Sequence, residues 1–366
     1  RDGSSAFSYT GNQWQNFYSA GAGWLMTEEE FMKDISWLDM LKLKGSWGTL
    51  GNQNLDTAYP AEPLLENAFG AVFGNPSTIY PGYQLAYLPN ANLRWEKVEA
   101  WEAGFESNMF RNRLHVEGVY YKKNTKDLLA KVPGLSGTIP GIGNLGQIEN
   151  KGVELSATWR DQIGDWRYNV GVNLTTIKNK VKSLVQDGYS IIAGDKSQSY
   201  TMAGYPIGFF YGYKVDGVYQ SQADIDASPK NTLATVTPGD LKFADVNGDG
   251  EITPADRTLI GDPTPDVTYG ISLGVSYKGW ELGIDMMGQG GNQIYRTWDN
   301  YNWAQFNYME QRLDRWHGEG TSNTQPVLNT GHAINFENSE YYVEDGSFFR
   351  IRNLQLGYTF DKALIS

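Results

Sequence analysis

The sequence predicts an all-β protein whose strands form one segment of a large antiparallel transmembrane β-barrel with long extracellular loops. Three observations carry this prediction. Side chains alternate between apolar and polar, the polar positions hold mostly small residues, and short turns alternate with long connections. Alternation alone also fits a soluble β-sandwich, so the other two observations decide between the classes.

Strict two-residue alternation occurs in three segments, at 153–160, 166–175 and 269–278. A strand with this pattern has one apolar and one polar face. Noisier alternation predicts further strands, about ten in all, near 18–26, 38–49, 97–110, 112–123, 280–288 and 349–360. The residues predicted to face lipid are Val153, Leu155, Trp159, Val170, Val172, Leu174, Ile271, Leu273 and Val275.

The polar face of these strands consists mostly of Gly, Ser, Thr and Asn, which suit the wall of a wide, water-filled lumen. A soluble sheet more often carries long Lys and Glu side chains there. Aromatic residues lie at strand ends beside short turns: Trp159 and Trp166 flank one turn, and Tyr277 and Trp280 flank another. These are the positions of an interfacial aromatic girdle.

The connections between strands differ sharply in length. Strand pairs are joined by about one to five residues, whereas the connections 124–150, 178–264 and 292–345 run to tens of residues. Short turns on one side and long loops on the other are typical of outer-membrane barrels. A closed barrel of about ten strands has little room for such loops, so we expect further strands outside this chain.

Composition excludes several classes of protein. The 366 residues carry 30 Lys+Arg and 42 Asp+Glu, a net charge of −12, which argues against a nucleic-acid binder. Aromatic residues make up 14%, too many for a disordered acidic chain, and the absence of Cys excludes disulfides and thiolate sites. The chain begins at Arg1 with no leader, so we expect a processed or cut piece.

Residues 245–256 follow the pattern of an EF-hand-like calcium loop, D-x-N-x-D-G with an acid at position 12. Hard Ca²⁺ prefers six to eight oxygen ligands, and Gly250 permits the sharp turn that brings them together. The predicted ligands are Asp245, Asn247, Asp249, Glu251 (through its carbonyl) and Asp256. The alternative is an acidic turn held by side-chain hydrogen bonds without metal. A bound ion would pin a surface loop structurally.

The stretch 292–318 is dense in aromatic residues and is predicted to be an extracellular loop. Its candidate substrate-binding residues are Trp298, Tyr301, Trp303 and Tyr308, which would stack on sugar rings or line a partner surface. The alternative is a loop that buries its own small core. The same choice applies to Phe209 and Phe210 with Tyr211 and Tyr213, for which packing against a plug inside the barrel is a further alternative.

No pattern in the sequence predicts an enzyme. His115, His317 and His332 are not at metal-ligand spacing and no nucleophile elbow accompanies them. Glu102 and Glu106 share a strand face, but residues four apart on a strand are about 13 Å apart, too far for a retaining glycosidase pair.

Several phrases of the sequence resemble the SusC/RagA family of TonB-linked outer-membrane transporters of Bacteroidetes. They occur in the family's order along nearly the whole chain. The phrases are 1–7 (RDGSSAF), 23–31, 41–48 (LKLKGSWG), 93–106, 144–155, 239–250, 260–265 and 349–353 (FRIRN).

The resemblance implies a large barrel with a plug in its lumen that imports oligosaccharides or peptides. It also implies a SusD-like surface lipoprotein over the mouth and the TonB complex on the periplasmic side. Residues 1–366 would form part of one barrel domain, without the plug, the TonB-contact segment or the terminal strands. The acidic loops would contact divalent cations and lipopolysaccharide. The alternative is a secreted or surface-attached β-rich glycan-binding protein with a calcium-stabilised loop.

Overall fold

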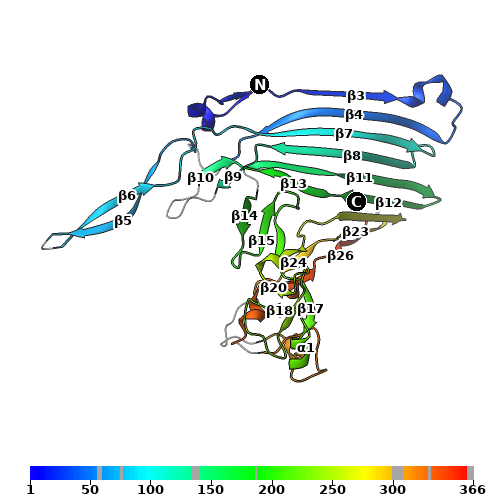
Figure 1. Cartoon of the computed structure of the whole chain (residues 1–366). Helices are drawn as coiled ribbons and strands as arrows, with labels where there is room; N and C mark the ends of the chain where they lie inside the picture. The colour runs from blue at the N-terminus through cyan, green and yellow to red at the C-terminus, as the bar shows by residue number, and fades with distance from the viewer. Residues whose placement is uncertain are drawn as a thin grey trace.

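The computed structural model contains one long, curved antiparallel sheet and a compact lobe beside it (Figure 1). It describes residues 1–55, 60–74, 77–132, 141–185, 188–298, 308–328 and 331–360. Nine long strands follow one another across the sheet in the order β26-β23-β22-β12-β11-β8-β7-β4-β3, and β13 also pairs with β11. The prediction of an all-β antiparallel fold is confirmed.

The long strands agree closely with the predicted segments. Their bounds are β3 (Ser19–Leu25), β4 (Leu38–Asn52), β7 (Glu96–Met109), β8 (Leu114–Lys126), β11 (Gly146–Ile163), β12 (Trp166–Thr176), β13 (Lys178–Leu184), β22 (Val267–Tyr277), β23 (Trp280–Gly290) and β26 (Phe348–Tyr358). The strand β11 is longer than its alternating stretch of 153–160, because the pairing of β8 and β13 with its first half continues the ladder.

Tight turns join the long strands at one end of the sheet. Lys278 and Gly279 both have positive φ, 44° and 88°, as a two-residue type I′ hairpin requires. A Cβ on Gly279 would lie 2.8 Å from the carbonyl oxygen of Thr359. Both the positive φ and this close approach therefore favour glycine at position 279. Gly164, with φ 60°, begins the turn from β11 to β12. These turns fix the register of the paired strands.

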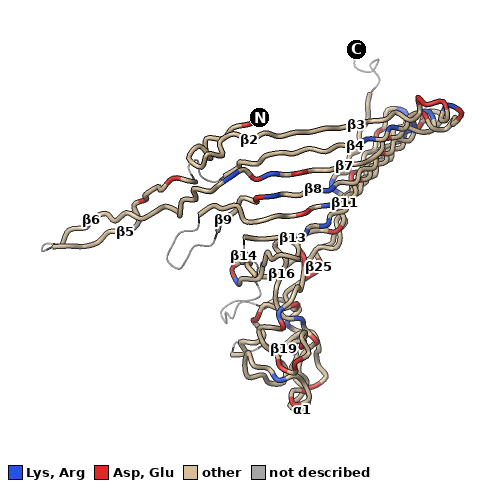
Figure 2. The backbone as a smooth tube through the Cα atoms, turned by 45° about the horizontal axis from the view of Figure 1, so that its top comes forward, with Lys and Arg blue, Asp and Glu red and all other residues tan. Residues whose placement is uncertain are grey.

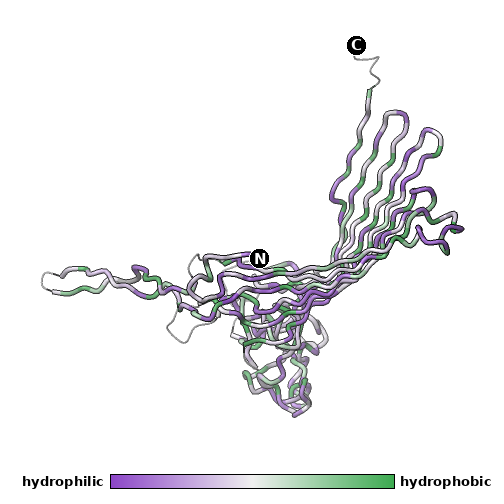
Figure 3. The backbone as a smooth tube through the Cα atoms, turned by 90° about the horizontal axis from the view of Figure 1, so that it is seen from above, coloured by the Kyte–Doolittle hydropathy of each residue, from purple (hydrophilic) through white to green (hydrophobic). Residues whose placement is uncertain are grey.

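Register divides the sheet into two faces of opposite character. One cross-strand row reads Trp159–Val170–Leu273–Ile284–Leu354, and the adjacent row reads Thr158–Gly171–Ser272–Asp285–Asn353. All nine residues predicted to face lipid lie on the apolar face. The alternation of hydrophobic and hydrophilic residues is visible along each strand in Figure 3, which also shows the curvature of the sheet.

Aromatic residues border the apolar face at both ends. At the turn end, the row Trp166–Tyr277–Trp280–Tyr358 has ring centroids 4.3 Å apart for its first pair and 4.8 Å for its last. Toward the other end, Trp47 and Trp101 lie 6.0 Å apart. Trp101 lies eight residues from the end of β7, a rise of about 27 Å. This height fits the apolar band of a membrane-spanning barrel.

The end of the sheet opposite the tight turns carries the long connections. One is the hairpin of β5 (Leu65–Phe73) and β6 (Thr78–Leu85), which projects away from the sheet in Figure 1. Short pairs also occur there: β1 (Asp2–Gly3) with β2 (Trp14–Gln15), and β9 (Leu129–Val132) with β10 (Gly141–Asn144). In the described segments, no helix has the length and apolar character to cross a membrane.

The connections β12–β22 and β23–β26, expected as long loops, together build the lobe. Its strands are β14 (Ser190–Ala193), β15 (Ser199–Met202), β16 (Phe209–Gly212), β17 (Val215–Val218), β18 (Lys230–Asn231), β19 (Leu241–Phe243), β20 (Glu251–Ile252), β21 (Thr258–Gly261), β24 (Gln293–Tyr295) and β25 (Val343–Asp345). Its helices are α1 (Gln222–Asp226) and the 3₁₀ turns η4 (Pro254–Asp256), η5 (Glu310–Asp314), η6 (Ala333–Phe336) and η7 (Glu340–Tyr342); η1 (Ser5–Thr10), η2 (Met26–Glu28) and η3 (Glu30–Met32) lie near the N-terminus.

The lobe has a hydrophobic core of its own. The buried side chains Tyr213, Val218, Leu241, Phe243, Ile252 and Ile334 pack into one cluster. The rings of Tyr213 and Phe243 stack with centroids 4.7 Å apart. Both long connections contribute to this cluster, so segments about 100 residues apart in the chain fold as one unit.

Candidate functional site: the polar wall and the extracellular lobe

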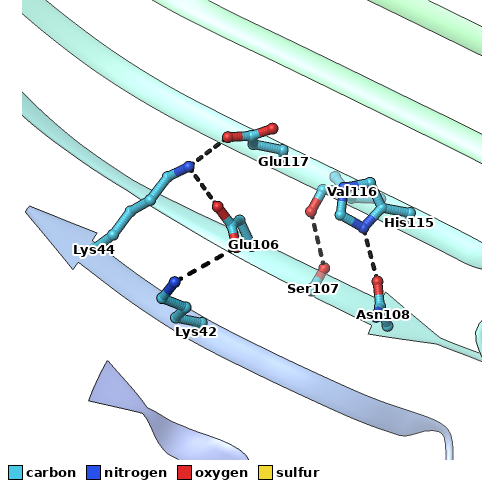
Figure 4. A network of polar contacts seen from close by, with 8 residues as sticks. All are labelled: Lys42, Lys44, Glu106, Ser107, Asn108, His115, Val116 and Glu117. Carbon is cyan, nitrogen blue, oxygen red and sulfur yellow. Dashed lines mark hydrogen bonds and ion pairs between the residues drawn. The ribbon is translucent and has the colours of Figure 1, made fainter. Parts of the chain in front are cut away.

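The polar face of the sheet carries a strip of charged residues across β4, β7 and β8 (Figure 4). The Nζ of Lys44 lies 2.7 Å from Glu106 Oε1 and also pairs with Glu117. The Nζ of Lys42 lies 3.9 Å from Glu106 Oε2. Glu106 and Glu117 are direct cross-strand neighbours, and like charges in that position repel. Lys44 therefore neutralises a repulsion that the register itself creates.

A hydrogen-bonded pair extends the strip toward the turn end, because His115 Nδ1 lies 2.7 Å from Asn108 Oδ1. Ser107, between Glu106 and Asn108 on β7, lies on the opposite face, where its hydroxyl donates to the carbonyl of Val116 at 3.4 Å. His115 is therefore held by an amide on the polar face, the position that its alternation with Leu114 and Val116 indicates. Acidic and basic residues also occur side by side along the strands in Figure 2.

Glycine residues hollow the polar face at two places. Gly21, Gly23, Gly45 and Gly104 help to line a hollow of about 540 Å³ beside the charged strip. A second hollow of about 770 Å³ lies nearer the tight turns, where its charged lining residues are Arg160, Asp161, Arg167 and Glu281. The lining of these hollows is polar and mixed in charge. Among the described residues, no three His, Asp or Glu side chains form a metal-holding group.

The predicted calcium loop forms a tight acidic turn at the surface of the lobe. Asp245 accepts from the backbone N–H groups of Gly248 and Gly250 at 2.7 and 2.8 Å. Asn247 and Asp249 each accept from the N–H two residues further on, at 2.9 Å. Gly250 has φ 85°, which permits the sharp turn. The structure thus brings Asp245, Asn247 and Asp249 together.

Asp256 and Glu251 are placed differently from these three residues. Asp256 is fully buried and accepts from the N–H groups of Thr253 at 2.8 Å and Val246 at 3.0 Å. Burial acts to raise its pKa, but these backbone hydrogen bonds together outweigh burial and hold the pKa below its usual range. Asp256 therefore closes a capping box at η4. The Glu251 carboxylate lies 3.8 Å from Lys230 Nζ. The ligand predicted from Glu251 is its backbone carbonyl, which this ion pair does not involve.

The donor set of the loop is compatible with a hard cation. Each carboxylate or amide oxygen has two lone pairs, so hydrogen bonds within the loop leave acceptor capacity on Asp245, Asn247 and Asp249. Asp256 has less to offer, because both of its oxygens already accept from backbone N–H groups.

Of the four aromatic residues predicted to bind substrate, two lie in the described part of the chain. Trp298 and Tyr308 are 59% and 48% exposed, and the guanidinium of Arg296 lies 5.9 Å from the Trp298 ring. Tyr301 and Trp303 lie outside the described residues. Of the second aromatic group, Phe210 and Tyr213 are buried in lobe cores, so for these two residues the alternative of core packing holds.

Nothing in the sequence predicts the charged strip, because its members lie on three strands and meet only through register. The one signal is parity: Lys42, Lys44, Glu106 and Glu117 occupy the same alternate positions as the small polar residues. Parity identifies their face but does not say which of them pair.

Comparison with known proteins identifies the class. The family model described as "TonB dependent receptor-like, beta-barrel" matches residues 1–365. The chain therefore belongs to this family of TonB-dependent receptors, which are outer-membrane β-barrel proteins and not enzymes. The family match also decides between the two readings that the sequence left open, in favour of the membrane barrel.

Individual relatives agree with this assignment. TonB-dependent receptor P26 of Formosa agariphila is 32% identical over 98% of this chain and 36% of its own length. TonB-dependent receptor SusC of Bacteroides thetaiotaomicron is 29% identical over 98% of this chain and 35% of its own length. The resemblance to SusC/RagA proteins is thus confirmed, and the chain spans just over a third of these relatives.

Solved structures show the same fold. The structure titled "Structure of the RagAB peptide transporter" aligns over 99% of this chain and 38% of the neighbour, with a TM-score of 0.79 and 24% identity. The RagAB peptide importer in the 'closed-closed' state aligns over the whole chain and 38% of the neighbour, with a TM-score of 0.77 and 25% identity. The long strands therefore form the wall of a TonB-dependent type of barrel.

Proposed function

We propose that this chain forms part of the barrel of an outer-membrane, TonB-dependent importer of oligosaccharides or peptides. The observation that carries the proposal is the two-faced wall: an apolar band between aromatic girdles on one face, and a hollowed, mixed-charge surface on the other. A polar molecule crossing the membrane would meet only the second face.

The proposed importer works with two partners. A SusD-like lipoprotein would cover the end that carries the lobe and the β5–β6 hairpin. The TonB complex would supply energy from the turn end, through segments outside this chain. Lipid and lipopolysaccharide would surround the apolar face. Family membership and the length asymmetry between the two ends of the sheet support this arrangement.

Uptake by living cells tests the function. A strain that lacks the full-length gene is given radiolabelled oligosaccharide and peptide mixtures, with and without a protonophore. We expect uptake of one mixture to require the gene and to stop when the protonophore collapses the proton gradient. Uptake that is equal with and without the gene for both mixtures would contradict the proposal.

We also propose that loop 245–256 binds a structural Ca²⁺. The convergence of Asp245, Asn247 and Asp249 around the turn at Gly250 supports this proposal. Elemental analysis of the purified full-length protein should find Ca²⁺, and Asp249→Ala should lose it. Asp226→Ala, an exposed acid of the same lobe, is the matched control and should keep it. Equal metal content in Asp249→Ala and wild type would end this proposal.

A further inference from the structure

One sheet of the lobe presents a cluster of aromatic rings that the proposed function does not yet use. Tyr200 of β15 pairs with Phe209 of β16, and Tyr211 follows two residues after Phe209. These three rings and Tyr205 form what we call the aromatic face. Ring centroids are 4.5 Å apart for Tyr200–Tyr211, 4.8 Å for Tyr205–Phe209 and 6.1 Å for Phe209–Tyr211.

The aromatic face is separate from the hydrophobic cores of the lobe. Phe210, on the opposite side of β16, packs with Ile260, Tyr295 and Tyr342 in one core, whereas the rings of the aromatic face belong to neither core. Phe209 is fully buried and forms the floor, while Tyr205 is 39% exposed. Tyr200 and Tyr211 are half-buried. Three partly exposed tyrosines therefore lie over an apolar base.

A charge-balanced pair borders the aromatic face. Arg257, next to β21, extends over the ring of Tyr213 at 5.1 Å, and its Nη2 lies 3.2 Å from Glu337 Oε2. Its positive charge acts on both Tyr200 and Tyr211. The border of the aromatic face therefore carries a paired cation and anion and adds no net charge.

The tyrosine hydroxyls are donors as well as acceptors. Burial raises the pKa of Tyr211, and the neighbouring Tyr200 raises it further. The Tyr211 hydroxyl therefore stays protonated at every physiological pH.

We propose that the aromatic face is a subsite for a neutral oligosaccharide built of pyranose rings. This inference rests on the proposed import function and chooses between its two substrate classes. A pyranose ring has an apolar C–H face bounded by hydroxyls, which matches aromatic ring surface bounded by tyrosine hydroxyls. A peptide brings charged termini and side chains, whereas Arg257 and Glu337 already neutralise each other.

The aromatic face lies close to the wall strands. In Figure 1, β14 and β15 lie between the long wall strands and the part of the lobe that holds α1. A direct link confirms this closeness: the N–H of Val181, on β13 beside the wall, donates to the carbonyl of Tyr205 at 2.8 Å.

Binding by the purified full-length protein tests the inference. Wild type is applied to an array of neutral oligosaccharides of four to ten pyranose units, with α- and β-linked glucans, mannans, galactans and xylans, and to a matched array of short peptides. We expect binding to at least one oligosaccharide series. Tyr211→Leu and Tyr200→Leu should weaken it by about tenfold, as the loss of one ring contact implies.

Two further variants separate stacking from folding. Tyr211→Phe keeps the ring and should bind within about threefold of wild type. Tyr83→Leu makes the same change at a tyrosine that is 66% exposed on the β5–β6 hairpin, and should bind as wild type does. Equal binding by Tyr211→Leu, Tyr200→Leu and Tyr83→Leu would overturn the inference, as would binding to peptides alone.

The uptake experiment distinguishes this failure from failure of the proposed function. Energy-dependent uptake of peptides with no oligosaccharide binding overturns the aromatic subsite and leaves the import function standing. Oligosaccharide binding that depends on Tyr211, without gene-dependent uptake, supports the subsite and contradicts the import function.

Discussion

The wall and the lobe are both built from β-strands, but they differ in where their large apolar side chains lie. In the wall, large apolar side chains such as Leu354 and Ile351 are 65% and 61% exposed in the isolated chain. In the lobe, Leu241 and Ile252 are fully buried in the same hydrophobic cluster. The wall relies on its hydrogen-bond ladder and on surrounding lipid, whereas the lobe relies on its own core.

This difference teaches that alternation reports which solvent a strand contacts on each face, not whether the strand is buried. A wall residue is stabilised only when the lipid is present, and a lobe residue only when the distant segment that covers it has folded. Substitutions in the two regions should therefore differ in size and in their dependence on the bilayer.

The largest effect is expected in the lobe core. Phe243→Ala removes a buried ring stacked on Tyr213 and should destabilise the lobe by about 3–5 kcal/mol. Hydrogen exchange of β17 and β19 in the full-length protein measures the loss. Val246→Ala, at a residue that is 47% exposed, is the control and should change little. Similar protection in both variants would show that the lobe has no cooperative core.

The next effect is expected in the wall and depends on the face. Leu273→Arg places a charge in the apolar row between Val170 and Ile284, and should cost about 2–4 kcal/mol near the bilayer midplane. Ser272→Arg, one residue away on the polar face, should be nearly neutral. Denaturant titration of the full-length protein in lipid vesicles compares the two. Reversed effects would mean that the faces are exchanged.

A pH effect is expected in the lobe. The native pKa of Asp256 is lowered, because backbone hydrogen bonds stabilise its carboxylate more than burial destabilises it. Its contribution to stability is therefore complete above the unfolded value of about 3.9 and is lost as the pH falls through the native value. Thermal unfolding of the lobe between pH 6 and 3 should show this loss, and Asp256→Asn should show a shallower profile. Identical profiles would refute it.

The smallest effect is expected on the polar face of the wall. Lys44→Gln leaves Glu106 and Glu117 opposed across two strands and should cost at most about 1 kcal/mol, since the strip is partly exposed. Adding Glu117→Gln should recover most of the loss, which a double-mutant cycle in vesicles measures. A double variant less stable than Lys44→Gln alone would contradict the assigned pairing.

The sequence predicts the wall far better than the lobe, and the reason is physical. Within the wall, pairing is local and tight turns set the register, so two-residue alternation at Ile271, Ser272 and Leu273 is enough to place a strand and its faces. In the lobe, the N–H of Leu241 donates to Asn335 Oδ1, and the Leu241 side chain packs in one cluster with Ile334. Asn335 lies 94 residues further along the chain. No local pattern encodes such a contact.

The candidate sites also differ in how far the sequence predicts them. The motif at 245–256 predicts its turn because its hydrogen bonds join neighbours, as between Asp245 and Gly250. The aromatic face is not predicted, because Tyr200 and Tyr211 approach only when β15 pairs with β16. Density of aromatic residues in a sequence does not reveal which rings stack and which fill a core.

Solvent access along β22 tests the two-faced wall most directly. Residues 1–366 contain no cysteine, and single cysteines can be introduced from 269 to 277 in a cysteine-free variant of the full-length protein and spin-labelled in lipid bilayers. We expect oxygen dissolved in lipid to reach the odd-numbered positions and a water-soluble nickel reagent to reach the even-numbered ones. Collisions that vary smoothly along β22, or that are equal at Ser272 and Leu273, would contradict a wall with lipid on one side and water on the other.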